Sequence, residues 1–271
     1  MLWTTVIIVL LVAVTSVAGL FFPATYAKDT PYSRAGAIGS DLVDLFVVAP
    51  VLLVSGVKGY RGSVPAHLVW LGAQGYLLYN FVLYAFGAHF KALVFVYWAT
   101  LGLCFYATVF SLPLLSLAQI AQAYAPRAPR KTTAILFLLF ALPSAAFDLR
   151  EDIAALLAGQ VPPSAVAMNQ PVIFFHVLDL AFFLPALCIT AILLLRRKAV
   201  AYALAPALLA SLAIMNIELA AIVATMTRAG LGMSYAMLAP FAVFAIASTI
   251  LLGRYPSSAK TEAWAALPSA A

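Results

Sequence analysis

Residues 41–56 read DLVDLFVVAPVLLVSG, and residues 176–191 read HVLDLAFFLPALCITA. Each segment begins with polar residues and continues as the kind of apolar run that crosses a membrane, which takes about 20 mainly apolar residues. At an offset of 135 residues Asp44 aligns with Asp179, and each acid is followed by Leu and, six residues on, by Pro. The two segments therefore predict an internal repeat, although two Leu- and Phe-rich helices also match in part by chance.

The match extends to neighbouring polar residues. At the same offset Asp41 aligns with His176. One helix further on, Asn80 and Asn216 align at an offset of 136. A unit of four helices returns the chain to the side on which it started, so the second copy keeps the orientation of the first. We therefore expect a 4+4 parallel repeat whose halves are related by an axis along the membrane normal.

The composition of the whole chain agrees with membrane-spanning helices. Of the 271 residues, 65% are hydrophobic and 9% are charged, and the mean hydropathy is +1.06. Soluble domains carry about 25% charged residues and cannot bury so much apolar surface, and disordered chains are poorly hydrophobic. The sequence therefore predicts an all-α integral membrane protein. Cys104 and Cys188 lie inside apolar runs, which indicates small core residues and not a disulfide or a metal site.

Eight segments have the length and apolar character of transmembrane helices. They cover residues 2–22, 37–56, 65–87, 91–113, 132–150, 171–195, 199–227 and 232–253. The first lacks a basic start and exceeds the apolar core of a signal peptide, about 7–15 residues, so we expect it to be retained. The polar stretches 26–40 and 151–170 are then outer loops.

The charged residues predict the orientation. With the N-terminus inside, ten of the 15 Lys and Arg residues lie on the inner side and five on the outer side, as the positive-inside rule requires. Eight of the nine acidic residues lie in the outer half or its loops, and only Glu262 lies in the inner tail. The net charge of +6 therefore reflects helix orientation and does not indicate a nucleic-acid partner. We expect a multi-pass protein of the plasma (cytoplasmic) membrane with both termini in the cytoplasm.

The same spans divide the chain into units. We expect a first four-helix repeat over residues 1–125 and a second over residues 132–255. Residues 256–271 are rich in Ser and Ala and predict a flexible tail.

Ionisable residues inside these spans predict the site, because an Asp at the centre of a span costs about 2.5–3.5 kcal/mol on insertion scales. On the predicted topology they all lie in the outer half of the membrane and form an acidic pocket there. The candidates for ligand binding or proton coupling are Asp44, Asp148, His176, Asp179 and Glu218, with Asn80, Asn216 and Tyr79 as neutral companions.

Several of these residues also have a purely structural interpretation. Asp41 and Asp44 suit the first turn of a helix, where a carboxylate caps free N–H groups, and we favour capping for Asp41. Asp179 fits capping poorly, because Asn169–Pro171 predict a helix start more than two turns earlier. Tyr79 is equally well explained by ordinary helix packing.

A metal centre or cofactor is not expected. Zinc sites use several His or Cys ligands, whereas His67 and His89 lie at opposite ends of one predicted helix. Phosphate-binding loops, nucleophile elbows and nucleotide fingerprints are absent from the sequence. A carboxylate site for a hard cation is the remaining alternative.

The second half resembles the emopamil-binding-protein group, or EXPERA domain, a four-helix membrane module. That module has an acid in its first helix and an acid-Leu pair with a downstream Pro in its second. Here ALPSAAFDL at residues 141–149 and HVLDLAFFLP at residues 176–185 are similar to this arrangement. The first half keeps DLFVVAP at residues 44–50 but has no acid in its first helix. The resemblance therefore covers residues 132–255 better than the duplicate before them.

Four functions follow from these patterns. The resemblance implies a lipid- or sterol-like ligand near Asp148, Asp179 and His176, and we favour the binding or transfer of such an amphiphile. A proton- or cation-coupled small-solute transporter is the alternative that the repeat indicates. An intramembrane acid/base enzyme such as an isomerase is a third, and a subunit whose polar residues only join helices is a fourth. The expected partners are the lipid bilayer and a small amphiphile or ion, not nucleic acid, and a homo-oligomer is compatible with the sequence.

Overall fold

The computed structural model describes residues 1–258, which form helices and turns without a β-strand. The α-helices are α1 (Leu2–Phe21), α2 (Pro31–Val43), α3 (Ala49–Tyr60), α4 (Val64–Gly87), α5 (Val94–Ser111), α6 (Leu117–Tyr124), α7 (Arg130–Leu157), α8 (Pro163–Met168), α9 (Phe174–Leu178), α10 (Leu184–Leu195), α11 (Ala199–Arg228) and α12 (Leu238–Ser258). Two π-helical turns join consecutive helices, η2 (Asp44–Val48) between α2 and α3 and η4 (Asp179–Phe183) between α9 and α10. The 3₁₀ turns are η1 (Pro23–Tyr26), η3 (Leu112–Leu114) and η5 (Tyr235–Met237).

In the described part of the chain, seven helical segments are long and apolar enough to cross a membrane. They are Leu2–Phe21, Pro31–Tyr60, Val94–Leu114, Arg130–Leu157, Phe174–Leu195, Ala199–Arg228 and Tyr235–Tyr255. Large apolar side chains on their outer surfaces, such as Trp3, Phe46 and Phe110, are exposed, as expected where lipid covers the protein. The chain is therefore a multi-pass helical membrane protein.

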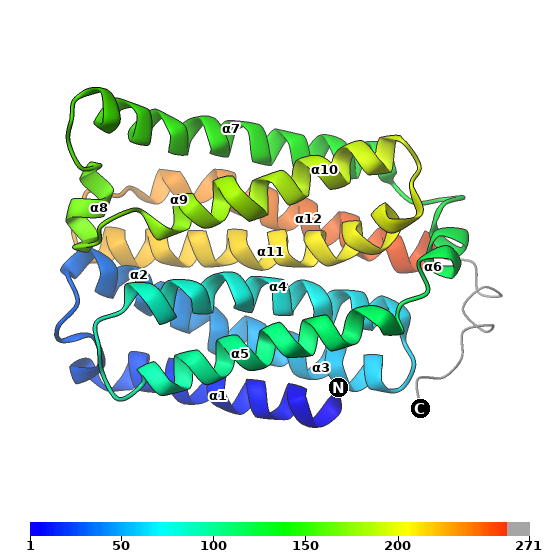
Figure 1. Ribbon diagram of the computed structural model, residues 1–271, viewed down its shortest axis with the longest axis horizontal. Coiled ribbons are helices and arrows are strands. Elements are labelled where there is room, and N and C mark those ends of the chain that lie inside the picture. Colours follow the sequence, from blue (N-terminus) through cyan, green and yellow to red (C-terminus); the bar gives the residue numbers. More distant parts are fainter. Residues whose placement is uncertain (259–271) are drawn as a thin grey trace.

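The predicted span at residues 65–87 corresponds to α4, which is not among these seven segments. This helix has 24 residues and lies alongside the others (Figure 1). Its buried residues include the polar side chains of His67, Gln74 and Asn80, which lower its hydropathy. The low hydropathy of α4 therefore comes from polar side chains that face the interior of the bundle.

The long helices form two groups of four with the same order of contacts. In the first group α1 packs on α3, α3 on α4, α4 on α5, and α5 on α1. In the second, α7 packs on α10, α10 on α11, α11 on α12, and α12 on α7. The groups meet where α11 packs against α2 and α4 (Figure 1).

Small residues allow the close approach between α4 and α11. A Cβ atom on Gly72 would lie 2.2 Å from the Ala207 carbonyl oxygen, which real contacts do not allow. The Ser211 hydroxyl donates a hydrogen bond to the Gly72 carbonyl at 2.6 Å. Small residues and interhelical hydrogen bonds are the usual means of holding membrane helices together.

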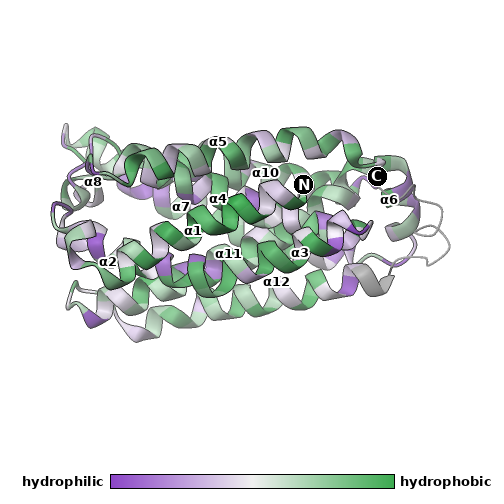
Figure 2. Cartoon of the chain, turned by 90° about the horizontal axis from the view of Figure 1, so that it is seen from below, coloured by the Kyte–Doolittle hydropathy of each residue, from purple (hydrophilic) through white to green (hydrophobic). Residues whose placement is uncertain are grey.

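The bundle has two distinct ends. The α6 end also holds the N-terminus and the last turns of α12, and the α8 end holds the start of α2 and the end of α7 (Figure 1). Hydrophobic residues cover most of the helices between the ends, whereas hydrophilic residues gather at the ends and in patches between helices (Figure 2).

Two predicted loops are in fact largely helical. In the stretch 26–40, α2 begins at Pro31 because the Thr30 hydroxyl accepts a hydrogen bond from the Ser33 N–H at 3.1 Å. In the stretch 151–170, α7 continues to Leu157 and α8 follows. Polar residues there lie on helical turns beyond the apolar runs, which hydropathy alone does not detect.

These bounds change the interpretation of two residues and of the tail. Asp41 lies inside α2 and does not cap it. The helix that holds Asp179 begins at Phe174, since Asn169 adopts a left-handed conformation that ends α8. The helix α12 continues to Ser258, so the first three residues of the predicted tail, 256–258, are helical. Residues 259–271 lie outside the described part of the chain.

Candidate functional site

Asp44 and Asp179 open the two π-helical turns, η2 and η4. In each turn the backbone carbonyl of the Asp accepts a hydrogen bond from the N–H five residues later. Pro50 and Pro185, six residues after each Asp, have no N–H and crowd the preceding turn, which explains why the regular ladder breaks there. Single π-helical turns inside α-helices are rare and occur often at functional sites.

The carboxylate of Asp44 is fully buried and receives its hydrogen bonds from α4. The Tyr76 hydroxyl donates to Oδ1 at 3.0 Å, and the Asn80 amide donates to Oδ2 at 2.9 Å. The same Asn80 amide also donates to the Tyr76 hydroxyl oxygen at 3.2 Å. Asp44 is therefore held by neutral donors from a neighbouring helix.

Asp41 lies one turn closer to the α8 end and is held by two tyrosines. The Tyr26 hydroxyl donates to Oδ2 at 2.6 Å, and the Tyr84 hydroxyl donates to Oδ1 at 3.3 Å. Gly19 of α1 provides the space for this carboxylate, because a Cβ atom there would lie 1.8 Å from Oδ2. We call Asp41 and Asp44 with these donors the first acidic cluster.

A polar connection at the α8 end fixes Tyr26. The Lys91 ammonium lies 4.4 Å from the centre of the Tyr26 ring, and Arg34 donates to the Tyr26 carbonyl at 3.1 Å. Asp29 pairs with His89 at 2.7 Å and with Lys91 at 3.0 Å. Burial and the charge of Asp41 raise the pKa of Tyr26 far above its usual value, so its hydroxyl keeps the proton that it donates.

The second acidic cluster consists of Asp148, Asp152, His176 and Asp179. His176 is buried between two carboxylates, with Nε2 3.4 Å from Asp148 and Nδ1 3.1 Å from both oxygens of Asp152. The other oxygen of Asp148, Oδ2, is buried without a hydrogen-bond partner in the described part of the chain. Two carboxylates therefore share one imidazole, and one of their oxygens has no donor.

Asp179 completes the second cluster from η4. It is close enough to interact with the charge of Asp148 and with the side chain of Tyr79. The Tyr79 ring packs edge-on against Phe183 with ring centres 6.1 Å apart. Asp179 is partly exposed, unlike the fully buried Asp44.

Glu218 and Asn216 lie on α11, the helix that packs against α2 and α4. Glu218 is buried and close enough to interact with Ser40, Tyr76 and the charge of Asp44. Asn216 donates to the Leu212 carbonyl of its own helix at 2.8 Å, and its Oδ1 has no partner in the described part. Tyr79 of the first half thus reaches the acid of the second half, and Glu218 of the second half reaches the acid of the first.

The intramembrane acids have few cationic partners. Within residues 1–258, Asp41, Asp44, Asp179 and Glu218 form no ion pair, and Asp148 pairs only with His176. The same residues contain no group of three or more His, Cys, Asp and Glu arranged to hold a metal ion. A surplus of carboxylates in an apolar setting must hold protons or attract a cation.

The structure brings most of the predicted residues together. Asn80 lies with Asp44, His176 with Asp148, and Tyr79 with Asp179, whereas Asn216 bonds only within its own helix.

Five members of the two clusters were not among the predicted site residues: Tyr26, Asp41, Tyr76, Tyr84 and Asp152. Tyr26 lies in a stretch that we expected to be a loop, so nothing in the sequence indicated its contact with Asp41. Asp152 follows Asp148 by four residues, a spacing that puts both on one helix face and that could have revealed it.

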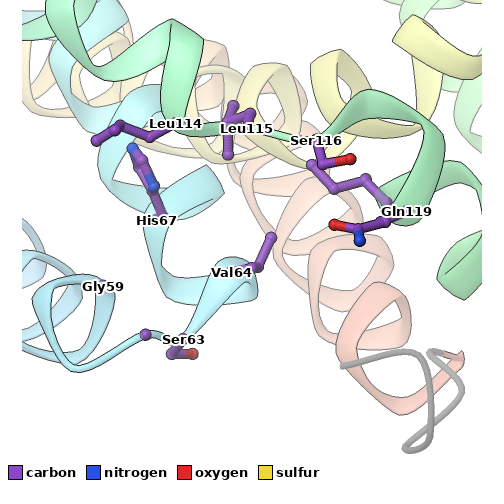
Figure 3. Close-up of a pocket in the computed structure, with 10 residues that line it drawn as sticks. Gly59, Ser63, Val64, His67, Leu114, Leu115, Ser116 and Gln119 are labelled. Atoms are coloured by element: carbon purple, nitrogen blue, oxygen red, sulfur yellow. The ribbon is translucent and has the colours of Figure 1, made fainter. Parts of the chain in front are cut away.

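Two pockets lie at the α6 end and not at the acids. The smaller, of about 80 Å³, lies between the α3–α4 turn and the α5–α6 connection (Figure 3). His67, Leu114 and Gln119 contribute to its lining, and Nε2 of His67 has no partner in the described residues. The larger pocket, of about 520 Å³, adjoins α6, α7 and α11.

Comparison with protein-family models, with curated proteins and with solved structures finds no match to this chain.

Proposed function

We propose that this protein binds a small amphiphilic molecule through a cationic head group at the second acidic cluster. The observation that carries the proposal is the imbalance of that cluster, in which Asp148 and Asp152 share the single imidazole of His176, Asp179 forms no ion pair in the described part of the chain, and one oxygen of Asp148 has no donor. A protonated amine supplies the missing positive charge and N–H donors at once. The EXPERA-like motifs include the same Asp148 and Asp179, which agrees with a ligand of lipid-like size.

The surroundings of the cluster favour a ligand with an apolar body. Asp179 is partly exposed, and Phe147, Val177 and Phe182 on the neighbouring turns are exposed apolar side chains. A head group at Asp179 can therefore leave its apolar chain against these residues, where lipid tails otherwise lie. An inorganic cation has no apolar part, so these exposed side chains would add nothing to its binding free energy.

The first acidic cluster supports the structure of this site. Its carboxylates receive hydrogen bonds from Tyr26, Tyr76, Asn80 and Tyr84, and Asp44 is fully buried.

In the proposed architecture α4 is an eighth span, and the halves are duplicates with both termini cytoplasmic. The matching contact order of the two helix groups and the paired π-helical turns support the duplication.

The test is mass spectrometry of the molecules that co-purify with the protein in mild detergent. We expect a basic amphiphile with the wild type and its loss with Asp179→Asn, which removes the charge at a partly exposed site without breaking an ion pair. Asp29→Asn is the matched control, because it removes an acid from the same end outside the cluster. A neutral or anionic ligand, or equal loss in both variants, contradicts the proposal.

A second candidate is a proton-coupled transporter, and the first cluster favours it. Glu218, Asp44 and Tyr76 are close neighbours that exchange protons readily when one acid is neutral. In proteoliposomes such a transporter takes up a solute faster when a pH gradient is imposed. Glu218→Gln is expected to abolish that acceleration. Uptake that is independent of the gradient rules this candidate out.

A further inference from the structure

The larger pocket at the α6 end has a chemistry unlike that of the acidic clusters. It has a volume of about 520 Å³ and lies where α6, the start of α7 and the α10–α11 turn meet (Figure 1). Its lining consists of Ala121, Gln122, Ala125, Pro126, Arg130, Arg197, Ala199 and Tyr202. It contains two guanidinium groups and no carboxylate.

Neither guanidinium group has an ionic partner in the described part of the chain. Within residues 1–258, Arg130 and Arg197 form no ion pair, and the ion pairs that do occur lie at the α8 end. Arginine presents a planar set of N–H donors that matches phosphate and carboxylate oxygens. The pocket therefore has donors for an anion already in place.

Two helix N-termini add to the positive potential of the pocket. Arg130 is the first residue of α7, and Ala199 is the first residue of α11. The residues before them, Pro129 and Lys198, provide no side-chain cap, since neither side chain can accept a hydrogen bond. Free N–H groups at the start of a long helix favour a bound anion.

One further observation at the pocket points to a ligand. Tyr202 is 2% exposed, and its hydroxyl makes no hydrogen bond with any described residue. Arg197 has a φ of 56°, in the left-handed region where glycine is favoured, at the C-terminus of α10. This conformation belongs to the C-terminal cap of α10, in which the Arg197 N–H donates to the Leu194 carbonyl and the Lys198 N–H donates to the Leu193 carbonyl.

We propose that this pocket binds a phosphate group, with Arg130, Arg197 and the Tyr202 hydroxyl as donors. The apolar wall formed by Ala121, Ala125 and Pro126 suits the glycerol and upper chain of a lipid. Basic pockets between helices at a membrane surface take anionic lipid head groups. The phosphate comes either from such a lipid or from free phosphate in solution.

The experiment uses the full-length protein in mild detergent and native mass spectrometry. One arm titrates phosphatidylglycerol against phosphatidylcholine with the same acyl chains, and the other arm titrates inorganic phosphate. The test variant is Arg130→Gln with Arg197→Gly, in which glycine relieves the backbone strain so that folding is preserved. The control variant is Lys131→Gln with Arg196→Gln, which removes two charges one residue away, outside the pocket lining.

We expect the wild type to bind one phosphate-bearing ligand, and the test variant to bind it about tenfold or more weakly, as expected when charge-assisted hydrogen bonds are lost. The control variant is expected to bind like the wild type. Retention of phosphatidylglycerol identifies a lipid as the source, and binding of inorganic phosphate alone identifies a free anion. Binding of neither, or equal weakening in both variants, overturns the proposal.

Discussion

Asp44 and Asp179 each open a π-helical turn but have different surroundings. Asp44 is sealed and receives hydrogen bonds from Tyr76 and Asn80. Asp179 is partly exposed and lies beside Asp148 and Tyr79. At the scale of single residues, the two aspartates therefore differ in burial and in hydrogen bonding, which is why we propose the ligand site at Asp179 and not at Asp44.

Gly19 provides a test of the first acidic cluster at the same scale. A Cβ atom at this position would lie 1.8 Å from Oδ2 of Asp41 and 2.7 Å from the Tyr26 hydroxyl. We predict that Gly19→Ala lowers the stability by about 2 kcal/mol or more, because the buried carboxylate must leave its donors. The measurement is thermal unfolding in detergent.

Gly102 is the matched control for this substitution. It lies in α5 with open space around the position of a Cβ atom. Gly102→Ala is expected to leave the unfolding temperature unchanged or to raise it slightly, since alanine favours helix. Equal effects of the two substitutions would show that the packing around Asp41 is looser than described.

At the scale of elements, the sequence predicted the helices better than their ends. Hydropathy detects apolar runs, so it found each long helix but treated the start of α2 and the end of α7 as loops. Thr30 and Pro31 form a helix start that local sequence does encode. The π-helical turns were harder to predict from the sequence. Pro50 and Pro185 indicate a break in the regular α-helix, but they do not indicate that the break takes the form of a π-helical turn.

The sequence predicted which types of residue form the site, but not which of these side chains contact one another. Tyr76 and Tyr79, three residues apart on α4, contact different acids because α4 lies between the two halves. Contacts between distant segments, such as Tyr26 with Asp41, depend on tertiary packing that no local pattern specifies.

The connection between η1 and α2 provides a pH-dependent test at the element scale. Burial opposes the charge of Asp29, but hydrogen bonds from His89 and Lys91 hold its pKa below the usual value. A lowered carboxyl pKa contributes stability above the ordinary pKa, about 3.9, and this contribution is lost as the pH falls through the folded-state pKa.

Asp29→Asn is therefore expected to cost about 1 kcal/mol at neutral pH and progressively less below about pH 4. The measurement compares the unfolding temperatures of the wild type and the variant from neutral to acid pH. A difference that stays constant across this range would contradict the role of the Asp29 charge.

At the scale of the whole molecule, charge separates the two ends of the bundle. Asp148 and Asp152 lie in the second half of α7, which leads to α8, whereas the proposed phosphate pocket, with Arg130 at the start of α7, lies at the α6 end. From the positive-inside rule we predict that the α6 end is cytoplasmic.

Labelling of single cysteines tests this orientation. In a background of Cys104→Ala and Cys188→Ala, we substitute the exposed residues Arg127 and Gln160, at the α6 and α8 ends. A membrane-impermeant maleimide is expected to label Gln160→Cys in intact cells, and Arg127→Cys only after permeabilisation. The reverse pattern would contradict the orientation but not the fold.

The central claim is that the second acidic cluster recognises a cationic head group, and a matched pair of ligands tests it most directly. A long-chain primary amine and the alcohol of the same chain length are each titrated into the purified protein, and the unfolding temperature is measured. We expect the amine to raise the unfolding temperature of the wild type but not that of Asp179→Asn, and we expect the alcohol to raise neither. Equal shifts with amine and alcohol, or an unchanged amine effect in Asp179→Asn, would contradict it.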